Sequence, residues 1–253
     1  RYVVAFIAAA AYFWLISRAK FTLPKTHILT LLFAALFGYG LTNVFYTVSI
    51  LNTQVSNALF LFYTYAIIAP IMGYMILKDK LNKFNIISLI LSFFALLLLF
   101  QPNSFTTWQI GGFFAILSAV STASYLVARK KLLEYSASYM LLLNTFLGAV
   151  LVGALSITLE NSFYTQGDIN QLSINTWIVT ILFGIDNFLA WLTMTKGFEY
   201  FNATSSSVIL LSELIFGIFF AFLFFNEVPT MLTLAGGMCI LFASVLVIYK
   251  GKS

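Results

Sequence analysis

Two carboxylates stand near the middle of long apolar runs, Asp186 in residues 177–194 and Glu213 in residues 204–225. A charge at the centre of a membrane-spanning helix costs about 2.5–3.5 kcal/mol on insertion scales, so acids found there usually serve a function. Each acid lies about nine residues into its run, a depth of about 14 Å at about 1.5 Å per residue. We therefore expect both acids at one depth, lining a shared cavity that binds protons or another cation.

The two acids also have a purely structural interpretation. A Ser, Thr or Tyr hydroxyl from another helix could hydrogen-bond each carboxyl group without any role in substrate binding. Further polar or amphipathic groups near midspan are candidates for the cavity wall, and hydrogen bonding between helices is the alternative for each of them. These wall candidates are Asn43, Tyr65, Asn187 and Trp191.

A proline interrupts the apolar run of residues 55–76 at Pro70. Proline has no N–H to donate, and its ring displaces the carbonyl four residues earlier, which here belongs to Ala66. Pro70 thus frees a backbone carbonyl beside Tyr65, which is a candidate for part of a binding site. The alternative is a plain kink, which membrane helices tolerate.

The composition requires a membrane around these candidate residues. The chain of 253 residues is 61% hydrophobic and 8% charged, and it contains 28 Phe and 13 Tyr. An ordinary soluble domain carries about 25% charged residues. The apolar runs have the length that crosses a hydrocarbon core about 30 Å thick. The sequence thus predicts an all-α polytopic membrane protein.

Several other classes of protein are excluded or disfavoured. The net charge of +5 comes from basic residues in short loops between apolar runs, which does not predict a nucleic-acid site. One cysteine, Cys239, rules out an internal disulfide, and one histidine, His27, rules out a multi-histidine metal site. No nucleotide-binding or hydrolytic motif is present. We expect no enzyme activity, no metal and no cofactor.

Nine apolar segments can be counted, and each is separated from the next by a loop signal such as Pro, Asn or a charge run. They cover residues 2–16, 28–50, 55–76, 84–100, 110–127, 139–159, 177–194, 204–225 and 231–249.

Alternating these segments across the bilayer places 12 of the 13 basic residues on one side, with Arg1 as the exception. The positive-inside rule makes that side the cytoplasm and places the C-terminus there, as in a plasma or bacterial inner membrane. The basic residues on this side are Arg18, Lys20, Lys25, Lys78, Lys80, Lys83, Arg129, Lys130, Lys131, Lys196, Lys250 and Lys252.

Sliding the chain against itself by 148 residues superposes residues 77–100 on 225–248, with Asp79 on Glu227 and Tyr65 on Glu213. The two acids of the first pair fall on opposite sides of the membrane. The sequence therefore predicts two inverted repeats, as in many secondary transporters. We assign residues 1–103 and 104–253 to them. The second repeat has five helices and the first has four, so we expect a missing first helix and an intact 5+5 arrangement.

Two stretches then resemble the EamA-type family of the drug/metabolite transporter superfamily. Residues 56–81 are similar to its fourth helix, which ends in an acidic turn where Asp79 stands, and residues 205–229 are similar to its ninth helix. Glu213 and Glu227 match the two acids of the ninth helix, whereas Leu214 and Ala66 replace the family's prolines. Arg1 falls where the family commonly has an arginine early in its second helix.

The resemblance implies a secondary active transporter, an exporter or importer of a small polar organic metabolite, working by alternating access around a midplane cavity. Protons or another ion would couple to its carboxylates. A passive channel and a non-transporting membrane scaffold are the alternatives from other classes. Membrane lipid is an expected partner and nucleic acid is not. The substrate, the direction of transport and the oligomeric state are open.

Overall fold

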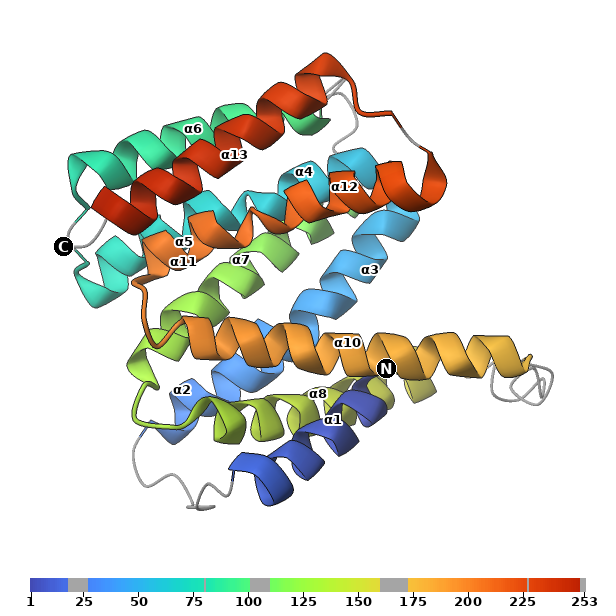
Figure 1. Ribbon diagram of the computed structural model, residues 1–253. Helices are drawn as coiled ribbons and strands as arrows, with labels where there is room; N and C mark the ends of the chain where they lie inside the picture. The colour runs from blue at the N-terminus through green and yellow to red at the C-terminus, as the bar shows by residue number, and fades with distance from the viewer. Residues whose placement is uncertain (18–26, 80, 101–109, 160–172, 227, 251–253) are drawn as a thin grey trace. The chain divides into compact units, whose positions relative to one another are not determined.

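A computed structural model describes residues 1–17, 27–79, 81–100, 110–159, 173–226 and 228–250. Every element in these ranges is helical (Figure 1), as predicted. Some residues used in the topology and repeat arguments lie outside the described ranges, namely Arg18, Lys20, Lys25, Lys80, Glu227 and Lys252.

Eight helical spans of the described part are long and apolar enough to cross a membrane, and a shorter apolar helix covers Tyr2–Ser17. The chain is an integral membrane protein, and its helices coincide with the nine predicted segments. In chain order the elements are α1 (Tyr2–Ala11), η1 (Tyr12–Ser17), α2 (Ile28–Phe33), η2 (Ala34–Leu41), α3 (Thr42–Asn52), α4 (Val55–Tyr63), α5 (Tyr65–Met72), η3 (Gly73–Leu77), α6 (Lys83–Phe100), α7 (Ile110–Lys131), α8 (Ala137–Leu159), α10 (Ile174–Gly197), α11 (Ala203–Leu210), α12 (Glu213–Phe225) and α13 (Met231–Lys250).

The elements labelled η are π-helices, wider turns within otherwise α-helical spans. In membrane spans such turns remain possible because the backbone groups they release find partners inside the protein. The π-helix η3 begins at Gly73, just after Pro70 has removed one α-helical hydrogen bond from α5.

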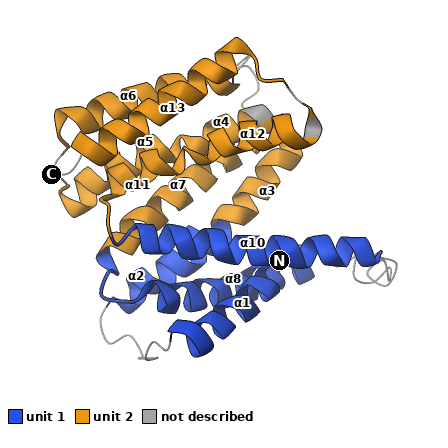
Figure 2. Ribbon diagram, viewed as in Figure 1, with its two compact units in different colours: residues 1–41, 131–199 blue, residues 42–130, 200–253 orange. Residues whose placement is uncertain are grey.

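The helices form two compact units (Figure 2). Unit 1 comprises residues 1–41 and 131–199, and unit 2 comprises residues 42–130 and 200–253. Each unit therefore takes helices from both predicted repeats. The repeat boundary near residue 103 stays a prediction from the sequence.

Unit 1 is held together by small residues that let helices approach closely. A Cβ at Gly184 of α10 would lie 2.5 Å from Cβ of Val4 in α1. A Cβ at Gly148 of α8 would lie 2.7 Å from the Tyr39 ring in η2. Close approach over small residues is a typical way of packing membrane helices, because lipid is as apolar as the helix surfaces themselves.

Unit 2 is organised around the antiparallel pair α6 and α13, which lie side by side (Figure 1). At one end of the pair the Asn82 amide donates to the Lys250 carbonyl at 3.1 Å. At the other end a Cβ at Gly236 would lie 2.8 Å from Cγ of Leu99 and 3.0 Å from the Ala95 carbonyl oxygen.

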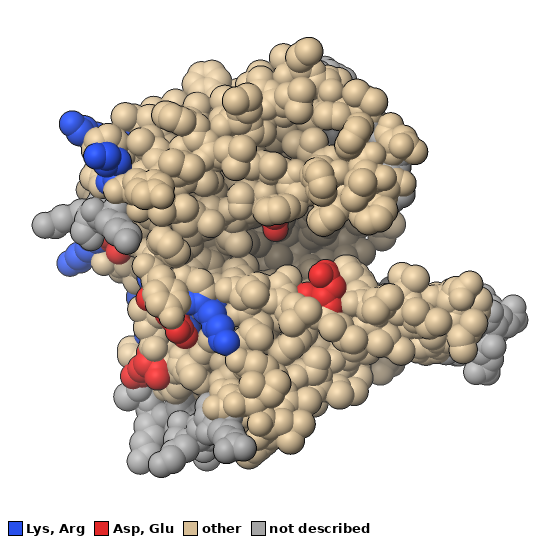
Figure 3. Space-filling view, in the orientation of Figure 1, with Lys and Arg blue, Asp and Glu red and all other residues tan. Residues whose placement is uncertain are grey.

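The surfaces of both units are apolar, as the lipid environment requires. In the space-filling view most of the visible face is free of Lys, Arg, Asp and Glu, which gather mainly at its left edge (Figure 3). Large hydrophobic side chains are exposed along many helices, among them Phe216, Phe220 and Phe224 of α12 and Met238 and Phe242 of α13.

Candidate functional site

In unit 2, two membrane spans are interrupted near their middle. The span of α4 and α5 breaks at Thr64, and the span of α11 and α12 breaks at Leu211 and Ser212. Hydrogen bonds three residues apart replace the α-helical pattern at both breaks: the Thr64 N–H donates to the Leu61 carbonyl at 3.3 Å, and the Ser212 N–H donates to that of Ile209 at 2.9 Å. Both breaks are single tightened turns of 3₁₀ type.

The second break positions the predicted acid Glu213. It is the first residue of α12, so its carboxylate lies at the positive end of a half-helix. The side chain is exposed rather than packed in the core of the unit. The Tyr63 hydroxyl, at the end of α4, lies within side-chain hydrogen-bonding reach of the carboxylate. A hydroxyl donor and a helix N-terminus thus surround the acid.

Two more tyrosines interact electrostatically with Glu213, namely Tyr46 of α3 and the predicted Tyr65 of α5. The Tyr63 and Tyr65 rings are 6.0 Å apart. Phe62 joins the group, with its ring centroid 5.1 Å from that of Tyr46 and 5.4 Å from that of Tyr65. We call Tyr46, Phe62, Tyr63 and Tyr65 the aromatic cluster. It brings α3, α4 and α5 to one carboxylate on α12.

The predicted opening at Pro70 has a partner on the opposite helix. Pro70 lies inside α5, and the carbonyl of Ala66 is within 3.1 Å of the Ser207 hydroxyl of α11. The same hydroxyl lies 2.9 Å from the Thr204 carbonyl in its own helix. The carbonyl at the predicted opening is therefore within hydrogen-bonding distance of a hydroxyl on the other interrupted span. Its role as a binding-site opening stays a prediction.

Asn43 is half-buried on α3, one turn before Tyr46, so the two side chains share a face of that helix. Its backbone carbonyl accepts a hydrogen bond from the Thr47 hydroxyl at 2.8 Å.

The remaining predicted residues lie in unit 1, on α10. The Tyr39 hydroxyl of η2 donates to Oδ1 of Asn187 at 3.1 Å. The Tyr39 ring meets the Trp191 ring edge-on, with centroids 4.5 Å apart. Tyr39 is fully buried, so Asn187 and Trp191 form one polar and aromatic contact group with it.

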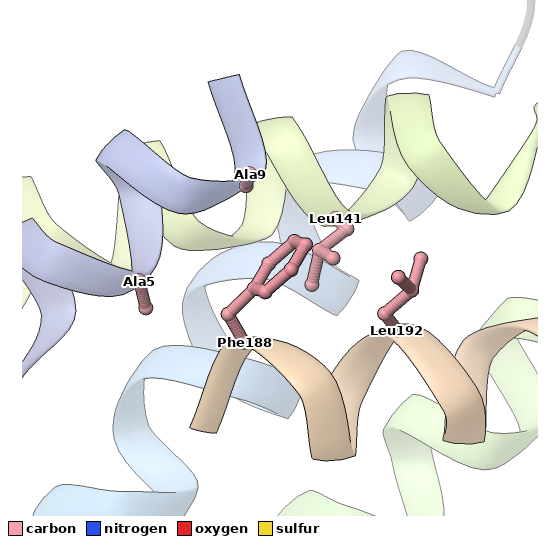
Figure 4. Close-up of a cluster of buried hydrophobic side chains, with 5 residues drawn as sticks. All are labelled: Ala5, Ala9, Leu141, Phe188 and Leu192. Carbon is pink, nitrogen blue, oxygen red and sulfur yellow. The ribbon is translucent and has the colours of Figure 1, made fainter. Parts of the chain in front are cut away.

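Asp186 lies on a different face of α10. Phe188 and Leu192 of this helix pack against Ala5, Ala9 and Leu141 (Figure 4). At 100° per residue, Asp186 is nearly opposite to that packed face, and its side chain is exposed. Among the described residues of unit 1, Asp186 therefore lies away from the packed face of α10. The pairing of Asp186 with Glu213 stays a prediction.

Sequence reasoning missed Tyr46, Tyr63, Ser207 and Tyr39. One signal was available for Tyr39: it precedes Asn187 by 148 residues, the offset of the predicted internal repeat. The others become visible only through contacts between helices. Within the described residues, no group of three or more His, Cys, Asp or Glu could hold a metal ion.

A protein-family model described as the EamA-like transporter family matches residues 1–101 and 109–249. The pseudopaline exporter CntI of Pseudomonas aeruginosa is 26% identical over 149 residues, which are 59% of this chain and 50% of the exporter. The chain thus matches about half the length of that relative. The S-adenosylmethionine uptake transporter of Rickettsia bellii is 23% identical over 233 residues, which are 92% of this chain and 75% of the transporter.

The fold also occurs in a solved crystal structure. It superposes with a TM-score of 0.77 over 98% of this chain and 86% of its own chain, at 13% sequence identity. At this identity the likeness concerns the fold alone.

Proposed function

Since the chain belongs to the EamA-like transporter family, we propose that it is a secondary active transporter of a small polar organic metabolite. It works by alternating access around a midplane cavity, with carboxylate-based coupling to protons or another cation. Its relatives include one exporter and one uptake transporter. These two relatives therefore do not indicate the direction in which this chain transports its solute.

The proposed mechanism requires two inverted repeats, and corresponding positions support them. The breaks at Thr64 and Ser212 are 148 residues apart, the offset found in the sequence. Lys78 and Asn226 are also 148 residues apart, and both adopt the left-handed conformation at the end of a helix, with φ of 57° and 55°. Neither is glycine, so each conformation is unusual for its residue type.

The packing of α6 on α13 supports the same symmetry. Buried positions Ser88, Ser92, Ala95 and Leu96 of α6 correspond at the 148-residue offset to Gly236, Ile240, Ala243 and Ser244, which are buried on α13. Two antiparallel helices that use equivalent faces against each other are related by a local two-fold axis. In unit 1, the Tyr39 hydroxyl donates a hydrogen bond to Asn187, which lies at the same 148-residue offset.

One observation carries the proposal: the two interrupted spans lie at equivalent positions, and an acid begins the half-helix after one of them. In secondary transporters, discontinuous helices with free helix ends form the site for substrate and coupling ion near the midplane. Glu213 takes the coupling role. Tyr65 and Asn43 of the same unit form its wall, and Asp186, Asn187 and Trp191 of unit 1 stay candidates from the sequence.

The proposal is tested by changing Glu213 to Gln in protein reconstituted into lipid vesicles. Labelled amino acids, polyamines, nucleosides and S-adenosylmethionine are screened for counterflow, and the pH dependence of the active solute is then measured. We expect the wild type to saturate and exchange. Glu213→Gln should lose pH-dependent transport while keeping its yield and unfolding temperature. The titratable groups facing Glu213 in unit 2 are Tyr46, Tyr63 and Tyr65.

Glu134→Gln serves as the matched control, because Glu134 is exposed in the turn between α7 and α8. Its transport and pH profile should match the wild type. Flux without saturation or counterflow would indicate a channel instead. A protein that moves no solute and tolerates loss of both midplane acids would be a scaffold.

A further inference from the structure

In the described part of unit 2, the Glu213 carboxylate interacts with tyrosines rather than with positively charged side chains. A carboxylate within a membrane span is normally paired or performs a function, because an isolated charge is costly there. The positive end of α12 stabilises the charge by a fraction of one elementary charge and does not neutralise it.

The surroundings of this acid are aromatic. Tyr46 and Phe62 are only half-buried, whereas Tyr63 and Tyr65 are 9% and 2% exposed. The Tyr63 ring stacks on the Phe100 ring of α6, with centroids 5.9 Å apart. Two rings of the aromatic cluster are thus buried, and the other two, Tyr46 and Phe62, keep part of their surface accessible. The face of an aromatic ring attracts a cation within about 6 Å of its centroid.

We propose that this site recognises an organic cation, an ammonium or sulfonium group carrying small alkyl substituents, with Glu213 supplying the charge and Tyr46 and Phe62 the contact surface. The inference rests on the proposed function, because the bound cation is taken to be part of the transported solute.

The same neighbours disfavour a metal ion. Mg²⁺ and Ca²⁺ require about six or more oxygen ligands at fixed distances. Glu213 and the aromatic cluster together offer one carboxylate and phenol hydroxyls. No metal-ligating group of three acids, histidines or cysteines occurs in the described part of the chain. An alkylated onium group is large and weakly hydrated, and it gains most from ring faces. Choline-type ligands are commonly bound by such rings.

The test compares a cation with a neutral molecule of the same shape. Binding to the purified 253-residue chain in detergent is measured by calorimetry and by thermal unfolding. The cations are choline, tetramethylammonium and trimethylsulfonium, and 3,3-dimethylbutan-1-ol is the neutral counterpart of choline. We expect saturable binding of at least one cation and binding of the alcohol that is at least about tenfold weaker, a difference that one charge contact readily supplies.

Three variants separate charge from ring. Glu213→Gln should abolish the preference for cations over the neutral alcohol. Tyr46→Phe should bind normally, because it keeps the ring. Tyr46→Leu should weaken cation binding by about 2- to 30-fold, the range that corresponds to one cation–π contact. Phe219→Leu is the control for the loss of a ring, since Phe219 is 55% exposed on α12 and is not in the aromatic cluster.

Equal affinity for choline and the alcohol would overturn the inference, as would unchanged cation binding in Glu213→Gln or no binding of any of the three cations. The assay needs neither a membrane nor a gradient, so its outcome is independent of transport. Counterflow of an uncharged solute with no cation preference would refute the cation site and leave the proposed transporter intact. Cation binding without counterflow of any solute would refute the transporter alone.

Discussion

Asp79 marks the end of the span that contains Pro70, just outside the membrane helix. Its backbone N–H donates to the Gly73 carbonyl at 3.3 Å. Its Oδ2 atom is buried without a hydrogen-bond partner among the described groups, and a Cβ at Gly73 would lie 3.2 Å from that oxygen. Burial raises the pKa of the Asp79 carboxyl above its ordinary value, and the Lys130 ammonium opposes the rise. The ionised form is therefore disfavoured in the folded protein.

Changing Asp79 to Asn should stabilise the protein at neutral pH and not at acidic pH. A carboxyl whose folded pKa is raised binds its proton more tightly in the folded state than in the unfolded state, so its contribution to stability falls as pH rises through that pKa. Thermal unfolding of both proteins between pH 4 and pH 8 measures the difference. We expect the advantage of Asp79→Asn to grow with pH. An advantage that grows towards low pH would contradict the raised pKa.

At the residue scale, the sequence predicted Glu213 and Tyr65 as candidates because an acid or a proline in an apolar run is unusual on its own. It did not predict Tyr63 or Ser207. Tyr63 stands one residue before a helix break, and Ser207 ends a run of three serines that is equally compatible with close packing. Their partners, Glu213 and the Ala66 carbonyl, are more than 100 residues away in the chain, and helix packing alone selects them.

At the element scale, the close packing of α6 against α13 depends more on Gly236 than on the adjacent Gly237. A Cβ at Gly236 would lie 3.0 Å from the Ala95 carbonyl oxygen, which is backbone and cannot rotate away. The nearest atom to a Cβ at Gly237 is Cδ1 of Ile218, at 3.9 Å. The two adjacent positions thus form a matched pair for the same substitution.

Gly236→Ala should destabilise the protein by about 1–3 kcal/mol, the usual effect of adding a methyl group to a tightly packed site. Gly237→Ala should be neutral or stabilise by about 0.5–1 kcal/mol, because alanine is the better helix former. Thermal or denaturant unfolding in detergent compares both variants with the wild type. Equal effects at the two positions would mean that helix propensity, rather than contact between α6 and α13, determines the result.

The helices themselves were predictable, because apolar runs of membrane length leave few alternatives to a helix. The breaks within them were not. Thr64, Leu211 and Ser212 are neither proline nor glycine, and Pro70, the strongest breaker of that span, lies six residues beyond the break. The turn at Thr64 is stabilised locally by its hydroxyl, which donates to the Leu61 carbonyl. A single threonine in an apolar run carries no signal of that kind.

At the scale of the whole molecule, compactness does not follow the order of the repeats. Each unit combines helices from both halves of the sequence. Helices that correspond in the predicted repeat contact each other, α6 with α13 and η2 with α10 through Tyr39 and Asn187. Sequence similarity measures correspondence between helices and carries no information about which of them bury their faces together. The assignment of residues 1–103 and 104–253 to repeats is thus compatible with units that cross that boundary.

The orientation of the chain remains a prediction from its charges, and the described positions allow a direct test. In a background carrying Cys239→Ala, single cysteines are introduced at four exposed sites. The positive-inside rule places Lys78 and Lys131 in the cytoplasm. It places Asn175, at the start of α10, and Val228, just before α13, on the opposite side. A maleimide that cannot cross membranes is applied to intact cells. Asn175→Cys and Val228→Cys should react at once, and Lys78→Cys and Lys131→Cys only after permeabilisation. The reverse pattern would invert the orientation. A mixed pattern within either pair would mean that a helix has been miscounted, since adding or removing one span between these sites exchanges the side of every later loop.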